Sequence, residues 1–520
     1  MATRPLQRRS GLTLARWLAL VALAVTPAGA RPVELTLLHT TDIHGHLLPT
    51  SDYEGNREVG GLLRCATRIE QVRAERDHVL LVDCGDLYQG SAESYLTDGR
   101  ATLRAMEFLK YDACVLGNHE FDWGLPKLLS LHQSTALPML AGNIVGRPSR
   151  ASPLARVQPF LMREIEGVRV AIVGLITPGV PSWSTPDLLG DALFERSVPA
   201  LKRIMPAVHA AEPDILVLAL HQGLRPYGDD YANEVKGIAE AFPEFDVILG
   251  GHTHQMVERA LVGGNTLYAQ AGYYAIWLGQ VDLTYDTVTR RVVQKRAQMH
   301  RLGTEVPMHT GLTAVVQQDL DRARDYLQGK AGHSDAVLRH AVDGLGQSPI
   351  QQLICRSLAE ATGADLVLHG VLDEEDLPAG EIRVSDVWRI VPYENRSALL
   401  SVTPAELTEI LDENLKRKGN IQFMGPFGFT YEIEDQAGTP HAVRLRLADG
   451  SIPHPRQRLR VAVNSYVVAS GGRRFPRLRE IAERVETRLQ LLDVDTRSAV
   501  LAYLAKHQPL RAEDLSVVRP

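Results

Sequence analysis

The stretch "YDACVLGNHEFDWG", residues 111–124, joins an apolar run to a dense polar cluster. The run reads as a buried strand, and the polar side chains that follow it are Asn118, His119, Glu120 and Asp122. Turns usually consist of glycine, proline and small polar residues, so this cluster belongs either to an unusual polar turn or to an active site. One histidine does not decide between the two. The decision depends on whether similar clusters recur in the chain.

Four other apolar runs in the sequence also end in polar side chains. They occupy residues 33–46, 78–86, 214–223 and 246–255, and the side chains are Asp42, His44, His46, Asp83, Asp86, His221, His252 and His254. Helical periodicity separates the runs, as in residues 60–75 and 199–211, so the sequence predicts a layered α/β architecture with parallel strands. Such folds place ligand sites at the carboxyl ends of their strands. Five clusters at that position therefore favour one functional site.

The residue types in these clusters indicate a metal centre. Seven of the side chains form a set of nitrogen and oxygen donors without a thiolate: Asp42, His44, Asp86, Asn118, His221, His252 and His254. This set suits zinc, manganese, iron or cobalt. A catalytic ion usually keeps about three protein ligands, so seven are too many for one ion and suffice for two if one carboxylate bridges them. Paired ions about 3.5–4 Å apart recur in enzymes that catalyse in-line displacement at phosphorus.

The order of the blocks resembles a known family. "TTDIHGH", "DCGDLYQG", "GNHEFDWG", "HQG" and "GGHTHQ" are similar to the successive signature blocks of the calcineurin-like metallophosphoesterases. More closely, they resemble the secreted bacterial 5′-nucleotidase family, which includes UDP-sugar hydrolases and 2′,3′-cyclic-nucleotide phosphodiesterases. The blocks cover nearly all of residues 33–260. The resemblance implies a layered α/β metallophosphoesterase sandwich over residues 31–300, followed by a second α/β substrate-binding domain.

The resemblance also implies a role for each residue of the site. Residues that match the ligands of the first ion are Asp42, His44 and His254, and those that match the ligands of the second are Asn118, His221 and His252. Asp86 matches the carboxylate that bridges the ions. His119 matches a non-ligand that donates a proton or positive charge to the phosphate, and Asp122 matches the carboxylate that orients it. Glu120 has no implied role and reads as a supporting residue. The implied reaction is in-line attack of a metal-bound hydroxide on phosphorus.

The second half of the chain resembles the C-terminal substrate domain of the same family. We expect a linker region at residues 301–335, where the stretch 310–332 predicts a single helix with a polar face. Residues 336–520 then carry the family's later blocks. The resemblance implies that this domain supplies aromatic side chains that stack on a base and arginines that bind phosphate.

Two blocks of this second domain depart from the family pattern. Residues 364–382 are acidic and lack the arginine of the family's Asn-Gly-Gly-Gly-Ile-Arg-like block. Residues 471–475 read Gly-Gly-Arg-Arg-Phe where the family has Gly-Gly-Asp-Gly and an aromatic residue. Both departures lie in the substrate domain, and the metal-binding blocks of the first domain keep the family pattern.

Two phenylalanine positions and one arginine position of the second domain are predicted to contact the substrate. Phe475 matches the stacking aromatic by position, and Phe423 or Phe427 is a candidate for its partner. The alternative, that these are ordinary core phenylalanines, stays open. Arg473 or Arg474 is the predicted replacement for the missing arginine, because a guanidinium group suits bidentate phosphate recognition.

The first thirty residues have the pattern of a signal peptide. Arg4, Arg8 and Arg9 precede the short apolar run 17–25, and Ala28-Gly29-Ala30 fits a cleavage site. We expect residues 1–30 to be removed and the chain to be periplasmic or secreted; a signal anchor is the alternative. No later stretch approaches the roughly 20 apolar residues of a membrane span.

The composition excludes some classes of protein. A formal net charge of −6 argues against binding of a nucleic-acid polymer through bulk electrostatics. Four cysteines are too few for a disulfide scaffold in a chain of 520 residues, and Cys84 and Cys114 read as buried free thiols.

The sequence thus predicts an exported phosphoesterase with two divalent metal ions and a small-molecule phosphate ester as substrate. Nucleoside 5′-monophosphates are the first expectation. Alternatives within the same chemistry are 2′,3′-cyclic nucleotides, nucleotide sugars and non-nucleotide esters. A thiosulfate-ester hydrolase on the same scaffold and a catalytically inactive binding protein are alternatives of other classes. Metal identity and oligomeric state stay open.

Overall fold

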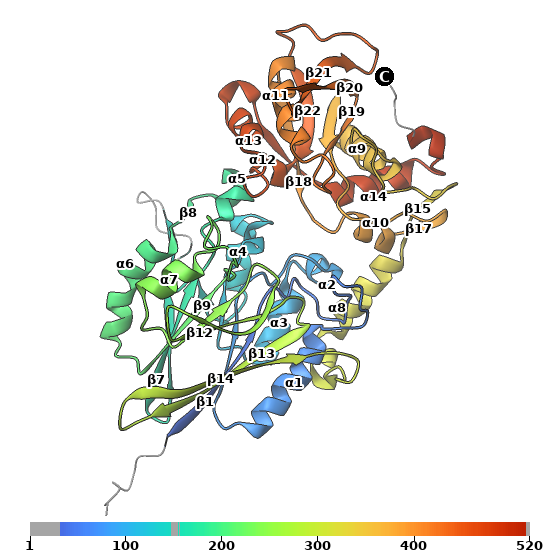
Figure 1. The fold of residues 1–520 in the computed structure, drawn as a ribbon. Coiled ribbons are helices and arrows are strands. Elements are labelled where there is room, and N and C mark those ends of the chain that lie inside the picture. Colours follow the sequence, from blue (N-terminus) through green and yellow to red (C-terminus); the bar gives the residue numbers. More distant parts are fainter. Residues whose placement is uncertain (1–31, 147–153, 155, 516–520) are drawn as a thin grey trace, which may run out of the picture.

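The computed structural model describes residues 32–146, 154 and 156–515. The predicted signal peptide lies outside these residues. The described chain forms two α/β units, a first unit from β1 to β14 and a second unit from β15 onward, with the helix α8 (Thr310–Gln328) between them (Figure 1). Among the residues that the structure describes, no helix combines the length and the apolar character needed to cross a membrane.

Two six-stranded sheets form the centre of the first unit. Along the first sheet the strands are β14 (Arg291–Arg301), β13 (Trp277–Asp286), β1 (Val33–Thr40), β2 (Val79–Asp83), β3 (Ala113–Val115) and β4 (Met139–Leu140). Along the second they are β11 (Met256–Val262), β12 (Thr266–Ala271), β10 (Val247–Gly250), β9 (Ile215–Leu220), β7 (Val168–Leu175) and β6 (Phe160–Ile165). β1 to β4 are parallel, as are β7, β9, β10 and β12. Each of the five apolar runs singled out in the sequence contains one of these parallel strands: β1, β2, β3, β9 or β10.

The two sheets pack face to face and helices cover their outer faces. Alternate residues of the strands, such as Leu37 in β1 and Val217 in β9, fill the core between the sheets. Helices over the first sheet are α1 (Leu62–Glu75), α3 (Arg100–Phe108), α4 (Leu125–Gln133) and α8, and those over the second are α6 (Ser197–Ala210) and α7 (Val235–Ala241). This arrangement confirms the predicted layered sandwich.

Two predicted helices have different ends in the structure. The helix predicted over residues 60–75 begins at Leu62, because Gly60 and Gly61 adopt positive φ angles of 67° and 83° that suit a turn. The helix predicted over residues 310–332 ends at Gln328, because residues 330–334 leave it and pair as a strand with β17 (Gly380–Arg383). The helical periodicity of residues 310–332 gives no sign that residues 330–334 pair with a strand about 50 residues further along the chain.

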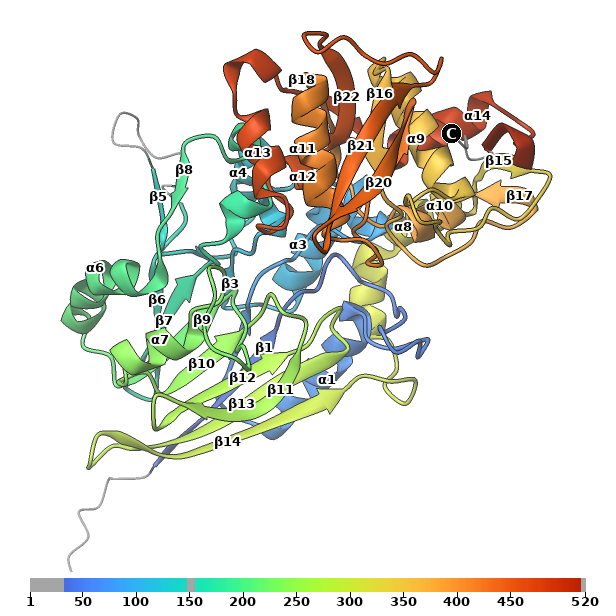
Figure 2. The same ribbon diagram turned by 45° about the horizontal axis from the view of Figure 1, so that its top comes forward.

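The second unit contains a five-stranded sheet with helices on both faces (Figure 2). Its strands, in spatial order, are β19 (Gly425–Phe427), β16 (Leu366–His369), β22 (Leu459–Asn464), β18 (Arg396–Val402) and β23 (Gln490–Asp495). One face packs against α9 (Pro349–Thr362), α10 (Val384–Ile390) and α14 (Thr496–Lys506), and the other against α11 (Pro404–Leu415) and α13 (Pro476–Ala482). The predicted second α/β unit is therefore confirmed.

The smaller elements connect these layers. They are α2 (Ala92–Leu96), α5 (Pro186–Leu189), α12 (Ser465–Val468), the short strands β5 (Ile144–Gly146), β8 (Ala192–Phe194) and β15 (Lys330–Ser334), the ribbon β20 (Phe429–Gln436) with β21 (Thr439–Leu447), and 3₁₀ turns at His119–Phe121, Val180–Ser182, Val485–Thr487 and Ala512–Leu515. All four cysteines are buried and free, as expected for Cys84 and Cys114.

Candidate metal centre and active-site cavity

The loops after β1, β2, β3, β9 and β10 bring the predicted metal ligands to one edge of the sandwich. Five of the seven have positive φ angles between 51° and 73°: Asp42, His44, Asp86, His252 and His254. A positive φ angle costs a non-glycine residue about 1–3 kcal/mol of conformational free energy. It persists only where the surrounding structure fixes it, and such residues are typical of ligand sites. Hydrogen bonds between the first two loops provide such fixing, since Asp42 N donates to Gly85 O at 2.8 Å and His44 N donates to Asp86 O at 2.9 Å.

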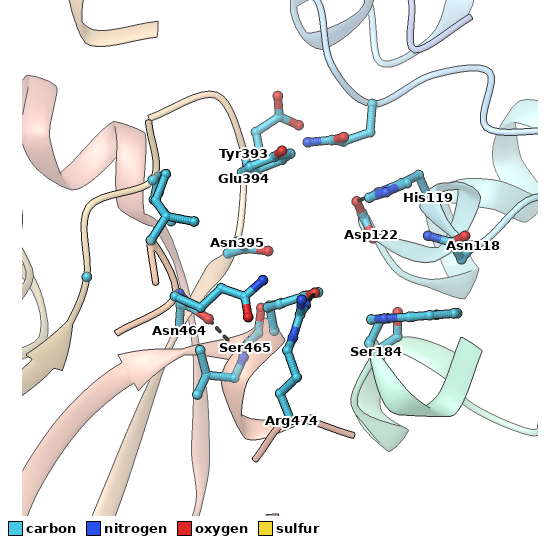
Figure 3. A pocket seen from close by; sticks show the side chains of 18 of the residues that line it. Asn118, His119, Asp122, Ser184, Tyr393, Glu394, Asn395, Asn464, Ser465 and Arg474 are labelled. Atoms are coloured by element: carbon cyan, nitrogen blue, oxygen red, sulfur yellow. Dashed lines mark hydrogen bonds and ion pairs between the residues drawn. The ribbon is translucent and has the colours of Figure 1, made fainter. Parts of the chain in front are cut away.

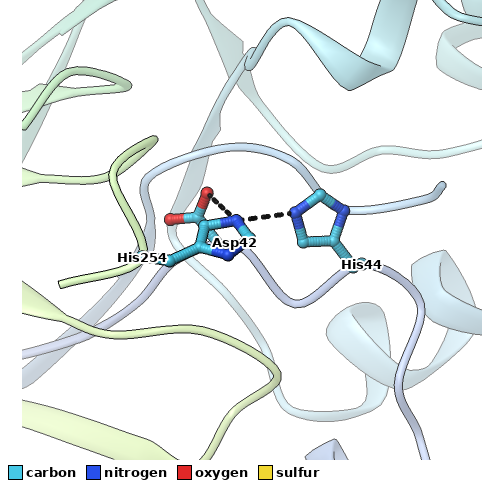
Figure 4. Close-up of side chains that lie close together, drawn as sticks. All are labelled: Asp42, His44 and His254. Atoms are coloured by element: carbon cyan, nitrogen blue, oxygen red, sulfur yellow. Dashed lines mark hydrogen bonds and ion pairs between the residues drawn. The ribbon is translucent and has the colours of Figure 1, made fainter. Parts of the chain in front are cut away.

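Asp42, His44 and His254 form one compact donor group (Figure 4). The two Nε2 atoms of the histidines lie 3.1 Å apart, and His254 Nε2 lies 3.3 Å from Asp42 Oδ1. His44 Nδ1 lies 2.6 Å from Gln89 O, and since a carbonyl can only accept, Nδ1 carries the proton and Nε2 a lone pair. Burial lowers the pKa of His44 to about 3, which keeps the ring neutral. A divalent ion fits between these lone pairs.

Asp86, His221 and His252 form a second donor group. His221 Nδ1 donates to Cys84 O at 2.7 Å, so its Nε2 faces Asp86 Oδ2 at 3.0 Å and Asn118 Oδ1 at 3.2 Å. Three acceptors in contact need either a proton on Nε2 or a cation between them. Burial lowers the pKa of His221, but Asp86 raises it to about 9, so the site already attracts positive charge. The group therefore fits a divalent ion as well.

Asp86 lies between the two groups. Its Oδ2 is 3.0 Å from His221 Nε2 and 3.8 Å from His44 Nε2, while Oδ1 accepts a hydrogen bond from His119 N at 2.9 Å. One carboxylate oxygen thus faces donors of both groups. This is the position that a bridging ligand requires.

His119 pairs with Asp122 beside the donor groups. The distance from His119 Nδ1 to Asp122 Oδ2 is 2.6 Å. Burial lowers the pKa of His119, but the charges of Asp122 and Asp86 outweigh it and raise the pKa to about 10. His119 also forms a third compact group with His44 and Asp86, so its geometry is compatible with both a ligand and a proton donor.

Glu120 holds the loops after β2 and β3 together. Its carboxylate accepts hydrogen bonds from the backbone N–H groups of Asp86 at 3.0 Å, Leu87 at 2.6 Å and Gly117 at 2.5 Å. Burial and the charge of Asp86 raise the pKa of Glu120 to about 7. The residue fixes the backbone on either side of Asp86 and before Asn118, which agrees with the supporting role predicted for it.

A cavity of about 650 Å³ separates the two units at this edge (Figure 3). This volume is in the range of about 300–1,000 Å³ that is usual for small-molecule sites. The wall from the first unit includes Asn118, His119, Asp122, Trp183, Ser184, His252 and His254. The wall from the second unit includes Tyr393, Asn395, Ile421, Gln422, Asn464, Ser465, Tyr466, Arg474 and Phe475. Catalytic groups and a second polar surface therefore face each other across the cavity.

Of the predicted substrate contacts, the structure places some at the cavity and others away from it. Arg474 and Phe475 line the cavity, although the ring of Phe475 is only 2% exposed and belongs to a core cluster of the second unit. Phe423 is also 2% exposed, lies in the same core and is not among the described residues that line the cavity. Arg473 points to the first unit, with its guanidinium carbon 4.0 Å from the ring centre of Tyr231.

Several cavity residues had no signal in the sequence. Tyr393 is 46% exposed, and Trp183 packs against the His252 ring with 5.0 Å between ring centres. The hydroxyl of Tyr53 lies 2.6 Å from His254 Nδ1. These aromatic residues lie on loops without a repeated pattern. A polar cluster after a strand is visible in the sequence, but the convergence of single aromatic residues from distant loops is not.

Comparison with known proteins agrees with this geometry. Residues 35–256 match the calcineurin-like phosphoesterase family, and residues 330–480 match the 5′-nucleotidase C-terminal domain.

The chain belongs to the 5′-nucleotidase family of calcineurin-like metallophosphoesterases. Members of this family are metal-dependent phosphoric ester hydrolases, and the two donor groups fit that chemistry.

Individual relatives resemble the chain over most of its length. The trifunctional nucleotide phosphoesterase protein YfkN of Bacillus subtilis is 26% identical over 491 residues, which are 84% of this chain and 32% of YfkN, so the chain spans about a third of that relative. Protein UshA of Yersinia enterocolitica is 24% identical over 543 residues, 95% of this chain and 96% of UshA. The crystal structure of a 5′-nucleotidase precursor from Thermus thermophilus shares the fold, with a TM-score of 0.66, 22% identity and coverage of 91% of this chain and 96% of that one.

Proposed function

We propose that this member of the 5′-nucleotidase family hydrolyses phosphate monoesters and that nucleoside 5′-monophosphates are its leading substrates. The observation that carries the proposal is the convergence of seven metal-competent donors at one edge of the first unit. Four of them, Asp86, Asn118, His252 and His254, line a cavity whose opposite wall is polar and aromatic. We also propose that the protein acts in the periplasm or is secreted, on the strength of the predicted signal peptide.

Two divalent ions, of zinc, manganese, iron or cobalt, fit the proposed site. The residues proposed to hold them are Asp42, His44 and His254 for one, Asn118, His221 and His252 for the other, and Asp86 for both. When bound, such ions supply Lewis-acid activation of the phosphoryl group and lower the pKa of water.

His119 and Asp122 are the proposed acid pair. Asp122 holds the His119 ring through Nδ1, which leaves Nε2 to donate a hydrogen bond to the phosphoryl group or the leaving oxygen. Burial lowers the pKa of His119, but the charges of Asp122 and Asp86 raise it to about 10, so these carboxylates favour the protonated ring. As the bond from phosphorus to the leaving oxygen breaks, the Nε2 proton passes to that oxygen and the leaving group departs as a neutral alcohol.

The leaving group is proposed to lie against the second unit. Tyr393 takes the place of Phe423 as the proposed partner of Phe475, because Tyr393 lines the cavity and Phe423 does not. The Tyr393 loop is held in place: the buried Arg497 donates to Val391 O at 2.9 Å and to Pro392 O at 2.7 Å. A fixed loop that presents a half-exposed ring suits a base as the leaving group.

The substrate proposal is tested with a panel of esters. The purified chain, loaded with each metal, is assayed on AMP, 2′,3′-cyclic AMP, UDP-glucose, glycerol 2-phosphate and a thiosulfate ester. We expect the highest kcat/KM for AMP. A higher value for another ester would replace the proposed substrate, and binding of AMP without hydrolysis of any ester would support an inactive binding protein instead.

Tyr393→Ala is expected to raise KM for AMP by about tenfold to a hundredfold, because stacking contributes about 1–3 kcal/mol per base. Hydrolysis of glycerol 2-phosphate, which has no ring, should not change. Tyr393→Phe keeps the ring and should stay close to the wild type, and Tyr227→Ala removes a fully exposed tyrosine outside the cavity as a control. Steady-state kinetics on both esters checks this, and equal losses on both would show that Tyr393 serves the fold instead.

Phe475→Ala is less informative as a test of stacking, since removal of a buried phenylalanine side chain costs about 3–5 kcal/mol of folding stability.

A further inference from the structure

The histidines proposed to bind metal differ in what holds the ring nitrogen that faces away from the donor groups. Nδ1 of His44 and Nδ1 of His221 each donate to a backbone carbonyl, at 2.6 Å and 2.7 Å. Nδ1 of His254 instead lies 2.6 Å from a side-chain oxygen, the hydroxyl of Tyr53. A hydrogen bond at this nitrogen fixes the tautomer and the orientation of a metal-binding imidazole. Of these three rings, His254 is therefore the one whose orientation depends on a side chain.

The Tyr53 hydroxyl faces the nitrogen that must carry a proton when His254 binds an ion. His254 Nε2 points to the donor group, 3.1 Å from His44 Nε2 and 3.3 Å from Asp42 Oδ1. A neutral ring that binds an ion through Nε2 carries its proton on Nδ1, where the Tyr53 oxygen accepts the hydrogen bond. The proton of the Tyr53 hydroxyl points in turn to the hydroxyl of Tyr274, 3.4 Å away.

Ring stacking and the closed ends of its loop hold Tyr53 in this position. The ring stacks on that of Tyr273, with 4.2 Å between the centres and 15° between the planes, and Tyr53 N donates to the Tyr273 hydroxyl at 2.9 Å. Two backbone hydrogen bonds between Thr50 and Val59, of 2.9 Å and 3.0 Å, close the loop. The hydroxyl therefore meets His254 from a fixed frame, although Tyr53 lines the cavity and is 65% exposed.

The contacts of Tyr53 concern one of the two proposed ions. Among the described residues, its side chain forms hydrogen bonds and ring contacts with His254, Tyr273 and Tyr274. The histidines proposed for the other ion are His221 and His252, which lie in the second donor group. Loss of the Tyr53 hydroxyl should therefore change the affinity for one ion and spare the other.

We infer that Tyr53 is a positioning residue for the ion proposed to bind Asp42, His44 and His254. Its hydroxyl holds the His254 ring in the orientation and the tautomer that leave Nε2 free to bind, so it acts on the ion through His254. The inference rests on the two-ion site of the proposed function. A hydrogen-bond partner of this kind typically contributes about tenfold to a hundredfold to metal affinity.

Removal of the hydroxyl alone tests the inference. Tyr53→Phe keeps the ring and its stacking on Tyr273. Tyr227→Phe removes the same group from a fully exposed residue away from the described lining of the cavity. Each protein is stripped with a chelator and titrated with zinc in competition with a chelating dye, which gives two dissociation constants. Tyr53→Phe is expected to weaken one of them by about tenfold to a hundredfold, whereas Tyr227→Phe should keep both.

Two further substitutions show which ion is weakened and by what route. His254→Ala should weaken the same ion as Tyr53→Phe, and His252→Ala should weaken the other. Without His254 the hydroxyl has no ring to orient, so Tyr53→Phe in the His254→Ala background should weaken that ion no further. The melting temperature separates this role from one in folding. Stripped Tyr53→Phe should melt like the stripped wild type and gain less stability when zinc is added.

Three results would overturn the inference. They are an unchanged zinc affinity in Tyr53→Phe, an equal weakening of both ions, and a lower melting temperature of stripped Tyr53→Phe, which would assign the hydroxyl to the fold. An equal extra loss with and without His254 would also contradict the route through that ring. If His254→Ala binds the ion too weakly to titrate, the melting comparison decides. Failure of the proposed function looks different, because the wild type would then bind zinc but hydrolyse no phosphate ester.

Discussion

Asp86→Ala is expected to lose both metal ions and essentially all hydrolysis of AMP. Asp86 Oδ2 lies 3.0 Å from His221 Nε2 and 3.8 Å from His44 Nε2, so its removal takes a donor from both groups at once. Three proposed ligands remain for each ion, but two cations close to each other repel and need a shared anion between them. Metal content of the desalted protein, measured by plasma mass spectrometry, and AMP hydrolysis check the expectation.

A matched variant separates metal loss from misfolding. Asp112→Ala removes a carboxylate directly before β3, where it pairs with Arg163 and accepts a hydrogen bond from Leu81 N away from the donor groups. It should keep both ions, whereas Asp86→Ala should keep its fold and lose them. If Asp86→Ala still carries two ions per chain, the proposed bridge is wrong.

His119→Ala is expected to keep both ions while kcat for AMP falls by about 10²–10⁴, the usual contribution of a positioned acid. The ring is held by Asp122 at 2.6 Å, and although burial lowers its pKa, Asp122 and Asp86 raise the pKa to about 10. The two carboxylates therefore favour the protonated ring that an acid requires. Metal analysis and steady-state kinetics on the same preparation measure both parts.

A comparison of two esters with different leaving groups distinguishes the two roles that the geometry allows for His119, namely proton donor and metal ligand. A nitrophenolate leaves without help from an acid, so p-nitrophenyl phosphate should lose much less kcat than AMP in His119→Ala if the ring protonates the leaving oxygen. Similar losses on both esters, together with loss of an ion, would instead make His119 a ligand with His44 and Asp86, the third donor group.

The clustering of the two donor groups at one edge of the first unit could be predicted because each donor follows an apolar run directly in the sequence. An apolar run followed at once by polar residues marks the end of a strand, as at Asp42 after β1 and His221 after β9. Parallel strands then align those ends without further information. The division into two sheets could not be predicted, because the periodicity of a strand does not say which neighbour it pairs with.

The second unit could be predicted in outline but not in its site. Phe423 and Phe475 were selected by position in the sequence, and both residues are only 2% exposed. Tyr393, which is 46% exposed and lines the cavity, was not selected. Its loop is held by hydrogen bonds from Arg497, a residue far from it in the sequence, and such contacts are not visible in a sequence pattern. Glu120 shows the same limit: its three backbone partners lie on two loops that meet only in the folded chain.

The metal stoichiometry of the wild-type protein during AMP hydrolysis tests the central claim most directly. The purified chain is stripped with a chelator and titrated with manganese or zinc, while bound metal and AMP hydrolysis are measured on the same samples. We predict that hydrolysis is lost on stripping and returns as the chain fills to two ions. Full AMP hydrolysis by a chain that holds no ion, or a maximum at one ion per chain, would contradict the account.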